Sequence, residues 1–331
     1  MNIRLFSGTA LLLFSVATAH AIDLDQPDVQ SFIDSMVEKH DFDREKLRDE
    51  LAAAEVKQSI LDAIARPAEK TKTWAQYRQH FLTRERIDAG AAFWKENKET
   101  LESISEATGV PVEILVGIIG VETYYGRITG SFRVLDALAT LAFSYPPRAK
   151  FFRRELEEYL LLVREEGMQA TAATGSYAGA MGRPQFMPSS YRAYAVDSTG
   201  DGKRDIWDNW TDVAGSIANY FLEHGWRPGE EVTVQASLGG GWQGPIPEPA
   251  NTLKATETIA SLSRQGVLFV TDLPADSKSE LLTLEGVDGA EHWIGFHNFF
   301  VITRYNRSVM YALAVHQLGQ EVALEVSGDA S

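Results

Sequence analysis

The chain lacks cysteine entirely and has few basic residues. No cysteine occurs among its 331 residues, which excludes disulfide bonds, thiolate metal sites, a cysteine nucleophile and a lipid-modified cysteine. Its 31 Lys and Arg residues are outnumbered by 46 Asp and Glu residues, so the formal net charge is −15. Nucleic acids and anionic membrane surfaces bind through concentrated positive charge, and neither partner is expected. Uncharged ligands such as glycans are compatible with this composition.

Long apolar runs are also missing. The apolar run at residues 10–17 is shorter than the ~20 residues needed to cross a bilayer as a helix. It follows Arg4 and precedes the small-residue segment Ala19–Ala21, an order typical of secretory signal peptides. We therefore expect residues 1–21 to be removed near Ala21, leaving an exported, soluble protein without stable membrane insertion.

Several catalytic signatures are absent. The seven histidines are scattered, so zinc hydrolase chemistry has no support. The sequence has no Gly-x-Ser-x-Gly turn, phosphate loop or dinucleotide-binding fingerprint. No organic cofactor is expected.

The strongest candidate for chemistry is a carboxylate at the end of an apolar helix, in the segment 117–126. Glu122 continues an apolar stripe formed by Ile114, Leu115, Ile118 and Ile119. Desolvation disfavours a charged carboxylate, so we expect a raised pKa and a group able to act as a general acid. The alternative is a structural glutamate that reaches solvent at the helix end. Gly126 is the expected helix stop.

The pattern of the chain predicts an α+β fold that is predominantly α-helical. Residues 22–108 are expected to form an N-terminal helical domain, with Asp43 capping its second helix and Pro67 ending the third. We expect residues 109–230 to form a core that carries Glu122 and includes a helix over about 150–166. Residues 231–290 form a small mixed subdomain with strands at 232–236, 267–270 and 281–284. The expected elements of the C-terminal segment 291–331 are a strand at 299–304 and a helix from Arg307 to Leu318, capped by Asn306 and ended by Gly319.

A loop rich in glycine and proline spans residues 175–190. Such a loop lets a ligand approach the backbone, which makes it a candidate floor for a cleft, although it could be a plain connector. Ser189 is the expected cap of a short helix through Ala195.

An acidic segment at residues 197–208 has the spacing of a calcium loop. Oxygen ligands fall at Asp197, Thr199, Asp201 and the Lys203 carbonyl, with Asp208 at the closing position. Asp208 is shorter than the usual glutamate, and Asp212 could close the site instead. The segment predicts a structural Ca²⁺ ion, with a solvated acidic turn as the alternative. Thr211 is the expected cap of the following helix, which Gly225 ends.

Three motifs, taken together, resemble the membrane-bound lytic murein transglycosylase B family. They are Gly-Val-Glu-Thr at 120–123, the loop at 175–190 and Phe-Val-Ile-Thr-Arg-Tyr-Asn at 300–306. The resemblance covers nearly the whole mature chain. It implies a lysozyme-like core with a helical domain and a small β-containing domain attached. It also implies cleavage of the MurNAc–GlcNAc β-1,4 bond of peptidoglycan without water, which leaves 1,6-anhydromuramic acid ends.

The resemblance also assigns roles to individual residues. Glu122 matches the family's sole catalytic acid and base, and Asp212 matches the last ligand of its EF-hand-like calcium site. Asn306 matches a position near the sugar's N-acetyl group. The other positions expected to bind substrate are Tyr77, Arg148, Ser176, Gln185, Phe186, Tyr220, Tyr305 and Tyr311. The implied partners are peptidoglycan glycan strands and proteins of cell-wall synthesis or hydrolysis, in the periplasm.

The chain departs from the family at two places. Pro147-Arg148 stands where many members have an arginine pair, which puts recognition of the peptide stem in doubt. Arg183-Pro184 replaces the Tyr-Gly of some members. Two other functions stay open: a lysozyme-type hydrolase that would need a second acid such as Glu223 or Asp136, and a non-catalytic peptidoglycan-binding protein.

Overall fold

The computed structural model of the chain describes residues 20–66, 72–242, 244–245 and 247–328. The expected signal peptide lies outside these residues except for His20 and Ala21, and Pro67 lies outside them as well. The described part confirms a predominantly helical α+β architecture.

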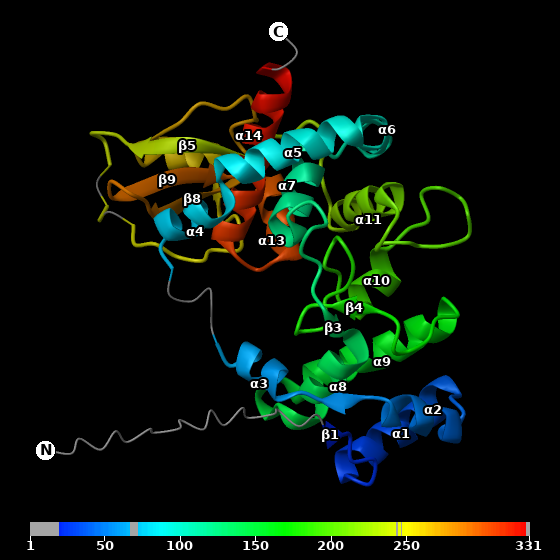
Figure 1. Cartoon of the computed structure of the whole chain (residues 1–331). Helices are drawn as coiled ribbons and strands as arrows, with labels where there is room; N and C mark the ends of the chain where they lie inside the picture. Colours follow the sequence, from blue (N-terminus) through cyan, green and yellow to red (C-terminus); the bar gives the residue numbers. More distant parts are fainter. Residues whose placement is uncertain (1–19, 67–71, 243, 246, 329–331) are drawn as a thin grey trace, which may run out of the picture.

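One part of the molecule combines N-terminal elements with two helices from the middle of the chain (Figure 1). Phe32 of the first helix packs against Phe143, and the Arg153 guanidinium pairs with Asp28. Asp43 caps the second helix as predicted, because its carboxylate accepts the Lys46 N–H at 2.8 Å. The elements are β1 (His20–Ala21), α1 (Pro27–His40), α2 (Arg44–Ala52), β2 (Glu55–Val56), α3 (Gln58–Ile64), α8 (Val134–Ser144), the 3-10 turn η1 (Pro146–Arg148) and α9 (Ala149–Glu165).

A second helical part lies above the first in Figure 1. Its elements are α4 (Trp74–Phe81), α5 (Arg84–Glu96), α6 (Lys98–Thr108), α7 (Val112–Thr123), α11 (Trp210–Glu223), α13 (His297–Tyr305) and α14 (Val309–Gly328). Here α7 packs against α14, and α6 packs against α11. The interval 22–108 is therefore shared between the two parts, because α4–α6 pack on α7, α11 and α14 while α1–α3 lie with α8 and α9.

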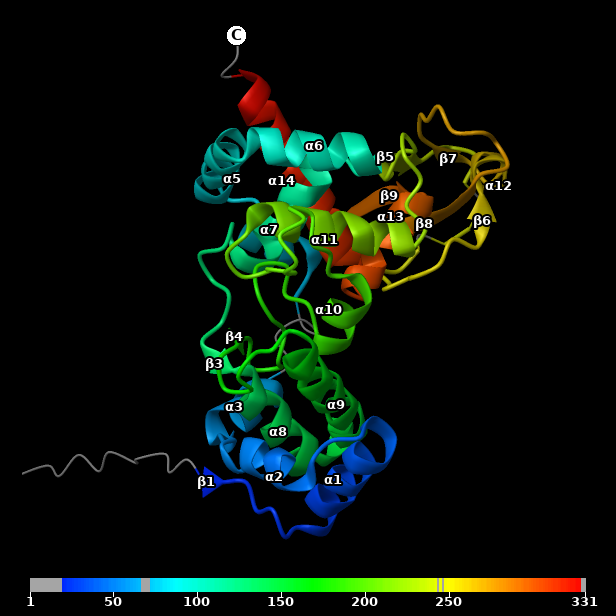
Figure 2. The same cartoon turned by 90° about the vertical axis from the view of Figure 1, so that its right-hand side faces the viewer.

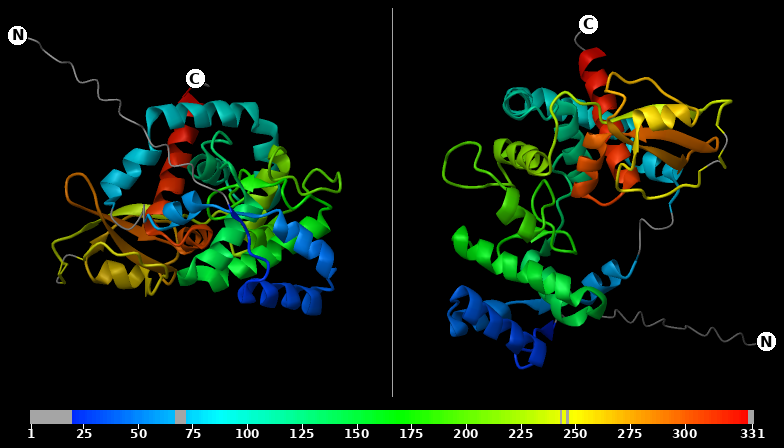
Figure 3. Two further views of the ribbon diagram at one scale, coloured as in Figure 1. Left: turned by 60° about the horizontal axis from the view of Figure 1, so that its bottom comes forward. Right: turned by 180° about the vertical axis from the view of Figure 1, so that it is seen from behind.

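Short elements join the two parts. Strand β3 (Phe132–Arg133) pairs antiparallel with β4 (Thr174–Gly175), and α10 (Pro188–Tyr194) packs against both α9 and α11 (Figure 2). The loop between α10 and α11, which contains the acidic segment, projects from the side of the molecule (Figure 3).

An antiparallel five-stranded sheet with the order β6-β8-β9-β5-β7 lies beside α14 and away from α1 and α2 (Figure 3). Three predicted strands correspond to β5, β7 and β8, whereas β9 was not predicted because Glu291 and His292 interrupt its apolar pattern. The elements are β5 (Thr233–Leu238), β6 (Glu257–Thr258), α12 (Ile259–Arg264), β7 (Val267–Leu268), β8 (Lys278–Glu285) and β9 (Ala290–Gly295). The sheet and α12 enclose a small core of their own that includes Leu262, Ile294 and Phe296.

The C-terminal elements differ from the prediction. Residues 299–304 belong to helix α13 (His297–Tyr305) and not to a strand. Every residue from Asn298 to Thr303 is buried, so the sequence lacks the alternation of polar and apolar residues that marks a helix with one exposed face. Asn306 ends α13 and does not cap the next helix, where the Ser308 hydroxyl accepts the Tyr311 N–H at 3.3 Å. Helix α14 continues past Gly319 because this glycine faces a close helix contact and not a turn.

Three other expected helix boundaries were wrong. Helix α7 ends at Thr123 and not at Gly126, because Tyr124 already adopts the left-handed conformation. Helix α10 begins at Pro188, and Ser189 donates to the buried Glu155 instead of capping the helix. Helix α11 is capped by Asn209 and not by Thr211: the Asn209 side chain accepts the N–H groups of Thr211 and Asp212.

Candidate active site

Glu122 lies in the last turn of α7, where the chain leaves the core. Every residue from Ile114 to Val121 is buried, whereas Glu122 is half-buried. Tyr124 and Tyr125 then have φ angles of 51° and 58°, and their N–H groups donate to the carbonyls of Gly120 and Ile119 at 3.2 Å each. Two successive left-handed residues that are not glycine are a strained arrangement held by their surroundings. The helix therefore stops just after Glu122.

Helix α14 brings a tyrosine to this carboxylate. The two backbones are close: a Cβ on Gly117 would lie 2.3 Å from the Val315 carbonyl oxygen. Across this contact the Tyr311 hydroxyl donates to Glu122 Oε1 at 2.5 Å. Burial and the Glu122 carboxylate hold the pKa of Tyr311 well above its ordinary value of 10, so the hydroxyl keeps its proton and remains a donor.

Aromatic side chains from separate elements surround this pair. Tyr305 stacks on Tyr311 with ring centroids 6.5 Å apart, and Phe186 lies 5.8 Å from both Tyr220 and Tyr305. Tyr77 is close enough to contribute to the raised pKa of Tyr311. The structure thus brings these five predicted aromatic residues together from four helices and one loop, and Tyr311 connects them to Glu122.

The hydroxyls of two of these tyrosines bind the backbone. Tyr305 donates to the Pro184 carbonyl and Tyr220 donates to the Arg304 carbonyl, each at 2.7 Å. Burial, with the Glu122 charge next in importance, raises the pKa of Tyr305 well above 10. These bonds fix the rings as rigid walls beside the carboxylate.

The loop at 175–190 is shaped by the polar side chains that were predicted to bind substrate. The Ser176 hydroxyl oxygen accepts the N–H groups of Ala178 at 3.2 Å and Ala180 at 3.1 Å. Gln185 has a φ angle of 53°, and its amide donates to the carbonyls of Thr129 at 3.0 Å and Gly182 at 2.8 Å. These contacts set the conformation of the loop, and binding of substrate by Ser176 and Gln185 stays a prediction.

The last two predicted substrate residues lie in different places. Asn306 directly follows Tyr305 and is half-buried, so it stands at the edge of the aromatic cluster. Arg148 is exposed on η1 in the other part of the molecule, where its guanidinium lies 4.4 Å from the Phe151 ring centroid. The described contacts of Arg148 are therefore on α9 and not around Glu122.

Neither candidate for a second catalytic acid is well placed. Asp136 is fully buried, with both oxygens 2.8 Å from nitrogens of the Arg133 guanidinium and Oδ1 accepting the Glu55 N–H at 3.0 Å. Glu223 is exposed at the last residue of α11. The Asp136 carboxylate joins β2 to α8, which is a structural role.

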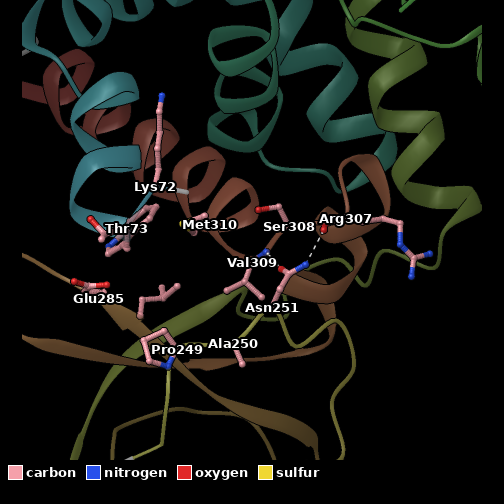
Figure 4. Close-up of a pocket in the computed structure, with 12 residues that line it drawn as sticks. Lys72, Thr73, Pro249, Ala250, Asn251, Glu285, Arg307, Ser308, Val309 and Met310 are labelled. Atoms are coloured by element: carbon pink, nitrogen blue, oxygen red, sulfur yellow. Dashed lines mark hydrogen bonds between the residues drawn. The ribbon is translucent and has the colours of Figure 1, made fainter. Parts of the chain in front are cut away.

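A pocket of about 570 Å³ borders the cluster on the side of α4 (Figure 4). Ser308, Val309 and Met310, which directly precede Tyr311, line it together with Trp74, whose ring stacks on Tyr77. The Asn251 side chain accepts the Val309 N–H at 2.8 Å and donates to the Arg307 carbonyl at 3.0 Å, which fixes the start of α14. The remaining lining residues are Lys72, Thr73, Pro249, Ala250, Leu284, Glu285 and Arg307.

The acidic loop wraps its backbone around the first carboxylate. Asp197 accepts the N–H groups of Gly200 at 2.6 Å, Asp201 at 3.2 Å and Gly202 at 2.7 Å. Partial desolvation is the largest single influence on the pKa of Asp197 and raises it, but the hydrogen bonds together outweigh this effect, so the pKa is lowered. The Lys203 N–H donates to the Asp201 carboxylate at 2.9 Å, which closes the tip of the loop.

The two candidate closing residues differ in environment. Asp212 is fully buried and accepts the N–H groups of Ser198 at 2.9 Å, Thr199 at 3.2 Å and Asp205 at 2.9 Å. Asp208 is exposed. Within the described residues, no three Asp, Glu, His or Cys side chains are grouped so that they could hold a metal ion. The oxygen donors suit Ca²⁺, while in this conformation the Asp197 and Asp212 carboxylates bind backbone N–H groups.

Two residues that were not predicted as site residues support Glu122. Thr123 is fully buried, and its hydroxyl donates to the Arg183 carbonyl at 3.1 Å. Arg183 was noted only as a departure from the family pattern. Thr123 could have been found from the sequence, because it is a polar residue directly after Glu122. Arg183 could not, because its partners belong to separate segments that only the fold brings together.

Comparison with known proteins identifies close relatives. The family model described as Transglycosylase SLT domain matches residues 24–320. Membrane-bound lytic murein transglycosylase B of Escherichia coli (strain K12) is 43% identical over 309 residues, which cover 91% of this chain and 84% of that protein.

Solved structures agree with this match. SltB1, a lytic transglycosylase from Pseudomonas aeruginosa in catenated form, has a TM-score of 0.85 and 47% identity, covering 91% of this chain and 98% of that one. The Escherichia coli lytic transglycosylase Slt35 in complex with calcium has a TM-score of 0.83 and 42% identity, covering 93% and 97%. SltB3 from Pseudomonas aeruginosa in complex with NAG-anhNAM-pentapeptide has a TM-score of 0.78 and 28% identity, covering 90% and 80%.

No single helix in the described ranges is long and apolar enough to cross a membrane. Helices α6 and α7 pass such a test only as a pair bent by 118°, by length and composition, and α7 is a buried helix of the core.

Proposed function

The chain belongs to the transglycosylase SLT family and is a lytic transglycosylase of peptidoglycan, and we propose that Glu122 alone serves as both acid and base in its reaction. The observation that carries the proposal is the Tyr311–Glu122 hydrogen bond at the end of a buried helix. Tyr311 holds one carboxyl oxygen and so fixes the orientation of the group. Asp136 is buried against Arg133 and Glu223 is exposed at the end of α11, so neither has an environment suited to a second catalytic acid.

The reaction then proceeds in two proton transfers. Glu122 first protonates the oxygen between MurNAc and GlcNAc, and the bond from that oxygen to the MurNAc C1 breaks. Positive charge develops at C1, where the ionised Glu122 and the dipoles of the cleft stabilise it. Glu122 next takes the proton of the MurNAc C6 hydroxyl while O6 bonds to C1. The attack is intramolecular and needs no water, and the product carries a 1,6-anhydro ring.

The aromatic cluster supplies the sugar-binding surface in this proposal. The Tyr305 ring is half-buried and would contact the face of a sugar unit, while the buried rings of Phe186 and Tyr220 pack against it. The Tyr77 ring is also buried and would contribute only its accessible edge. Asn306 would lie near the N-acetyl group, and Ser176 and Gln185 would line the opposite wall. The pocket at Ser308–Met310 extends this surface toward α4, with room for a further part of the substrate.

The roles of Glu122 are tested with Glu122→Gln, which keeps the shape of the side chain and removes its acid and base functions. We expect loss of product release from purified sacculi, with the melting temperature close to that of the wild type. Normal turnover by this variant would refute the assignment. A hydrolase and a transglycosylase are separated by product mass, because the anhydro product is lighter by one water than reducing-end muramic acid.

We also propose that the loop at 197–212 binds a structural Ca²⁺ ion in an EF-hand-like arrangement. Asp197, Thr199, Asp201 and the Lys203 carbonyl would supply oxygen ligands, and Asp208 or Asp212 would complete the set. The calcium complex of the related Slt35 supports this assignment. Asp212 accepts two backbone N–H groups at Oδ1 and one at Oδ2, so Oδ2 keeps a lone pair that could bind the ion.

The calcium proposal predicts that EDTA lowers the melting temperature and that Ca²⁺ restores it. Asp201→Ala should remove the response, while Asp288→Ala, in the turn between β8 and β9, should retain it. An identical melting curve with EDTA and with Ca²⁺ would contradict the proposal. Comparing Asp208→Asn with Asp212→Asn identifies the closing ligand.

For localisation, we propose export to the periplasm with cleavage near Ala21. The support is the order of Arg4, the apolar run at 10–17 and the small residues at 19–21. N-terminal sequencing of the protein from the periplasmic fraction should read Ile22 first. Recovery of the protein with Met1 intact would contradict this.

A further inference from the structure

Arg183 and the residue after it connect three segments near Glu122: the acidic loop, the end of α7 and the end of α13. The Arg183 N–H donates to the Ile206 carbonyl at 2.9 Å, and its carbonyl accepts the Thr123 hydroxyl at 3.1 Å. The acidic loop and the end of α7 are therefore joined through the backbone of one residue. The next carbonyl, that of Pro184, accepts the Tyr305 hydroxyl at 2.7 Å. Two adjacent peptide groups thus anchor both the catalytic helix and the aromatic wall.

The side chain of Arg183 holds this backbone in place. Its guanidinium carbon lies 3.9 Å from the centre of the Trp210 ring, and Nη1 donates to the Asp208 carbonyl at 3.0 Å. The Asp208 carboxylate is 3.7 Å away, and the Arg183 side chain is only 18% exposed. A planar guanidinium is suited to stacking and hydrogen bonding at once, which the ammonium of lysine cannot reproduce.

Thr123 transmits the position of Arg183 to Glu122. It is fully buried and adjacent to Glu122, and its hydroxyl oxygen also accepts the Gly126 N–H at 3.1 Å. That bond supports the turn formed by Tyr124 and Tyr125. The other side of the turn packs on Trp210, since a Cβ on Gly126 would lie 3.0 Å from its ring. A shift of Arg183 would therefore move the last turn of α7 and the carboxylate on it.

We propose that Arg183 is a positioning residue for the reaction. Its side chain is held by Trp210 and the Asp208 carbonyl, which fixes the peptide groups of residues 183 and 184. The Arg183 carbonyl orients Glu122 by way of Thr123, and the Pro184 carbonyl orients Tyr305. The inference depends on the proposed role of Glu122. Arg183 does not contact the reacting atoms, so it acts on the rate of the chemical step more than on binding of the glycan.

The test compares Arg183→Ala and Arg183→Lys with the wild type on soluble glycan strands, measuring kcat and KM. We expect Arg183→Ala to lower kcat about 10- to 100-fold, as for a misplaced catalytic group, with KM changed by less than about twofold. Arg183→Lys should recover only part of kcat. A kcat within about twofold of the wild type in either variant would overturn the proposal, and if Arg183→Ala fails to fold, the Arg183→Lys result decides.

A double-mutant comparison tests the path through Thr123. Thr123→Val removes the hydroxyl that bonds to the Arg183 carbonyl, while Arg183→Lys loosens the side chain that holds this carbonyl in place. Their effects on kcat should not multiply, because both act on the same path to Glu122. Independent, multiplying effects would overturn the path. The matched control is Arg164→Lys on α9: this guanidinium also lies over a ring, 4.2 Å from the centre of Phe42, and also donates to a backbone carbonyl, that of His40 at 2.7 Å. It should affect melting temperature and leave kcat unchanged.

Failure of this inference is distinguishable from failure of the proposed function. If Glu122→Gln retains turnover, the role of Glu122 is wrong whatever the Arg183 variants show. If Glu122→Gln abolishes turnover while Arg183→Lys and Arg183→Ala keep the wild-type kcat, only the positioning role is wrong.

Discussion

The hydrogen bond from Tyr311 to Glu122 makes Tyr311→Phe an informative substitution. The variant removes one hydroxyl and keeps the ring, so the stacking on Tyr305 at 6.5 Å is retained. What is lost is a donor to a carboxylate at 2.5 Å. Since the pKa of Tyr311 is raised far above 10, this hydroxyl is a donor throughout the pH range in which the enzyme is assayed.

The magnitude follows from the type of bond. A hydrogen bond to a charged group contributes about 1.5–3 kcal/mol, and about 1.4 kcal/mol corresponds to a tenfold change in rate. Glu122 is half-buried, so water can partly replace the lost donor, which favours the lower end of this range. We therefore expect kcat to fall about 10-fold in Tyr311→Phe, with the fold retained.

The assay is the initial rate of anhydromuropeptide release from purified sacculi, followed by mass spectrometry. Tyr220→Phe is the comparison, because it loses a bond to the neutral Arg304 carbonyl, worth about 0.5–1.5 kcal/mol. A Tyr311→Phe enzyme with wild-type kcat, or with a loss no larger than that of Tyr220→Phe, would refute the idea that this bond orients the catalytic carboxylate.

Two further predictions concern stability. Gly117→Ala places a methyl group 2.3 Å from the Val315 carbonyl, so it should lower the free energy of unfolding in urea by about 1–3 kcal/mol. Gly240→Ala is the control and should change little, because no atom lies within 4 Å of the added methyl group. Equal urea midpoints for the two variants would contradict the steric argument. Burial lowers the pKa of His316 to about 4 from its ordinary 6.5, so the unfolded state takes up a proton first as the pH falls. The free energy of unfolding should therefore decrease by up to about 3 kcal/mol as the pH falls from 6.5 to 4. His316→Gln should remove this part of the pH dependence. If urea unfolding of this variant shows the same pH dependence as the wild type, His316 is not its cause.

Local patterns predicted much of the helical architecture correctly. Asp43, the helix at 149–165 and the helix after the acidic loop follow from capping residues and apolar spacing. The C-terminal region did not follow the same rules. The segment 298–303 is buried on every side, and its aromatic and β-branched residues suggested a strand where the structure has a helix. Gly319 was interpreted as a helix end, whereas α7 approaches it so closely that a Cβ would lie 2.1 Å from the Glu113 carbonyl.

The sequence predicted several residues that the structure brings together, but it did not predict their arrangement, and their roles remain predictions. Glu122, Tyr305 and Tyr311 belong to motifs that can be recognised in the sequence, and the structure brings them together. The contacts of Arg183 with Trp210 and Thr123 depend on the path of the chain between motifs, which no spacing rule reveals. The raised pKa expected for Glu122 and the calcium ligands remain predictions.

The partner of the catalytic carboxylate comes from the last helix of the described chain. Glu122 and Tyr311 are 189 positions apart, and α14 passes alongside α7 through glycine contacts. A chain is synthesised from its N-terminus, so α7 emerges long before the residues that complete its surroundings. A nascent or truncated chain ending before α14 would present the glutamate without the hydroxyl that orients it. The orientation of the catalytic carboxylate therefore depends on a contact that cannot form until residue 311 has been made.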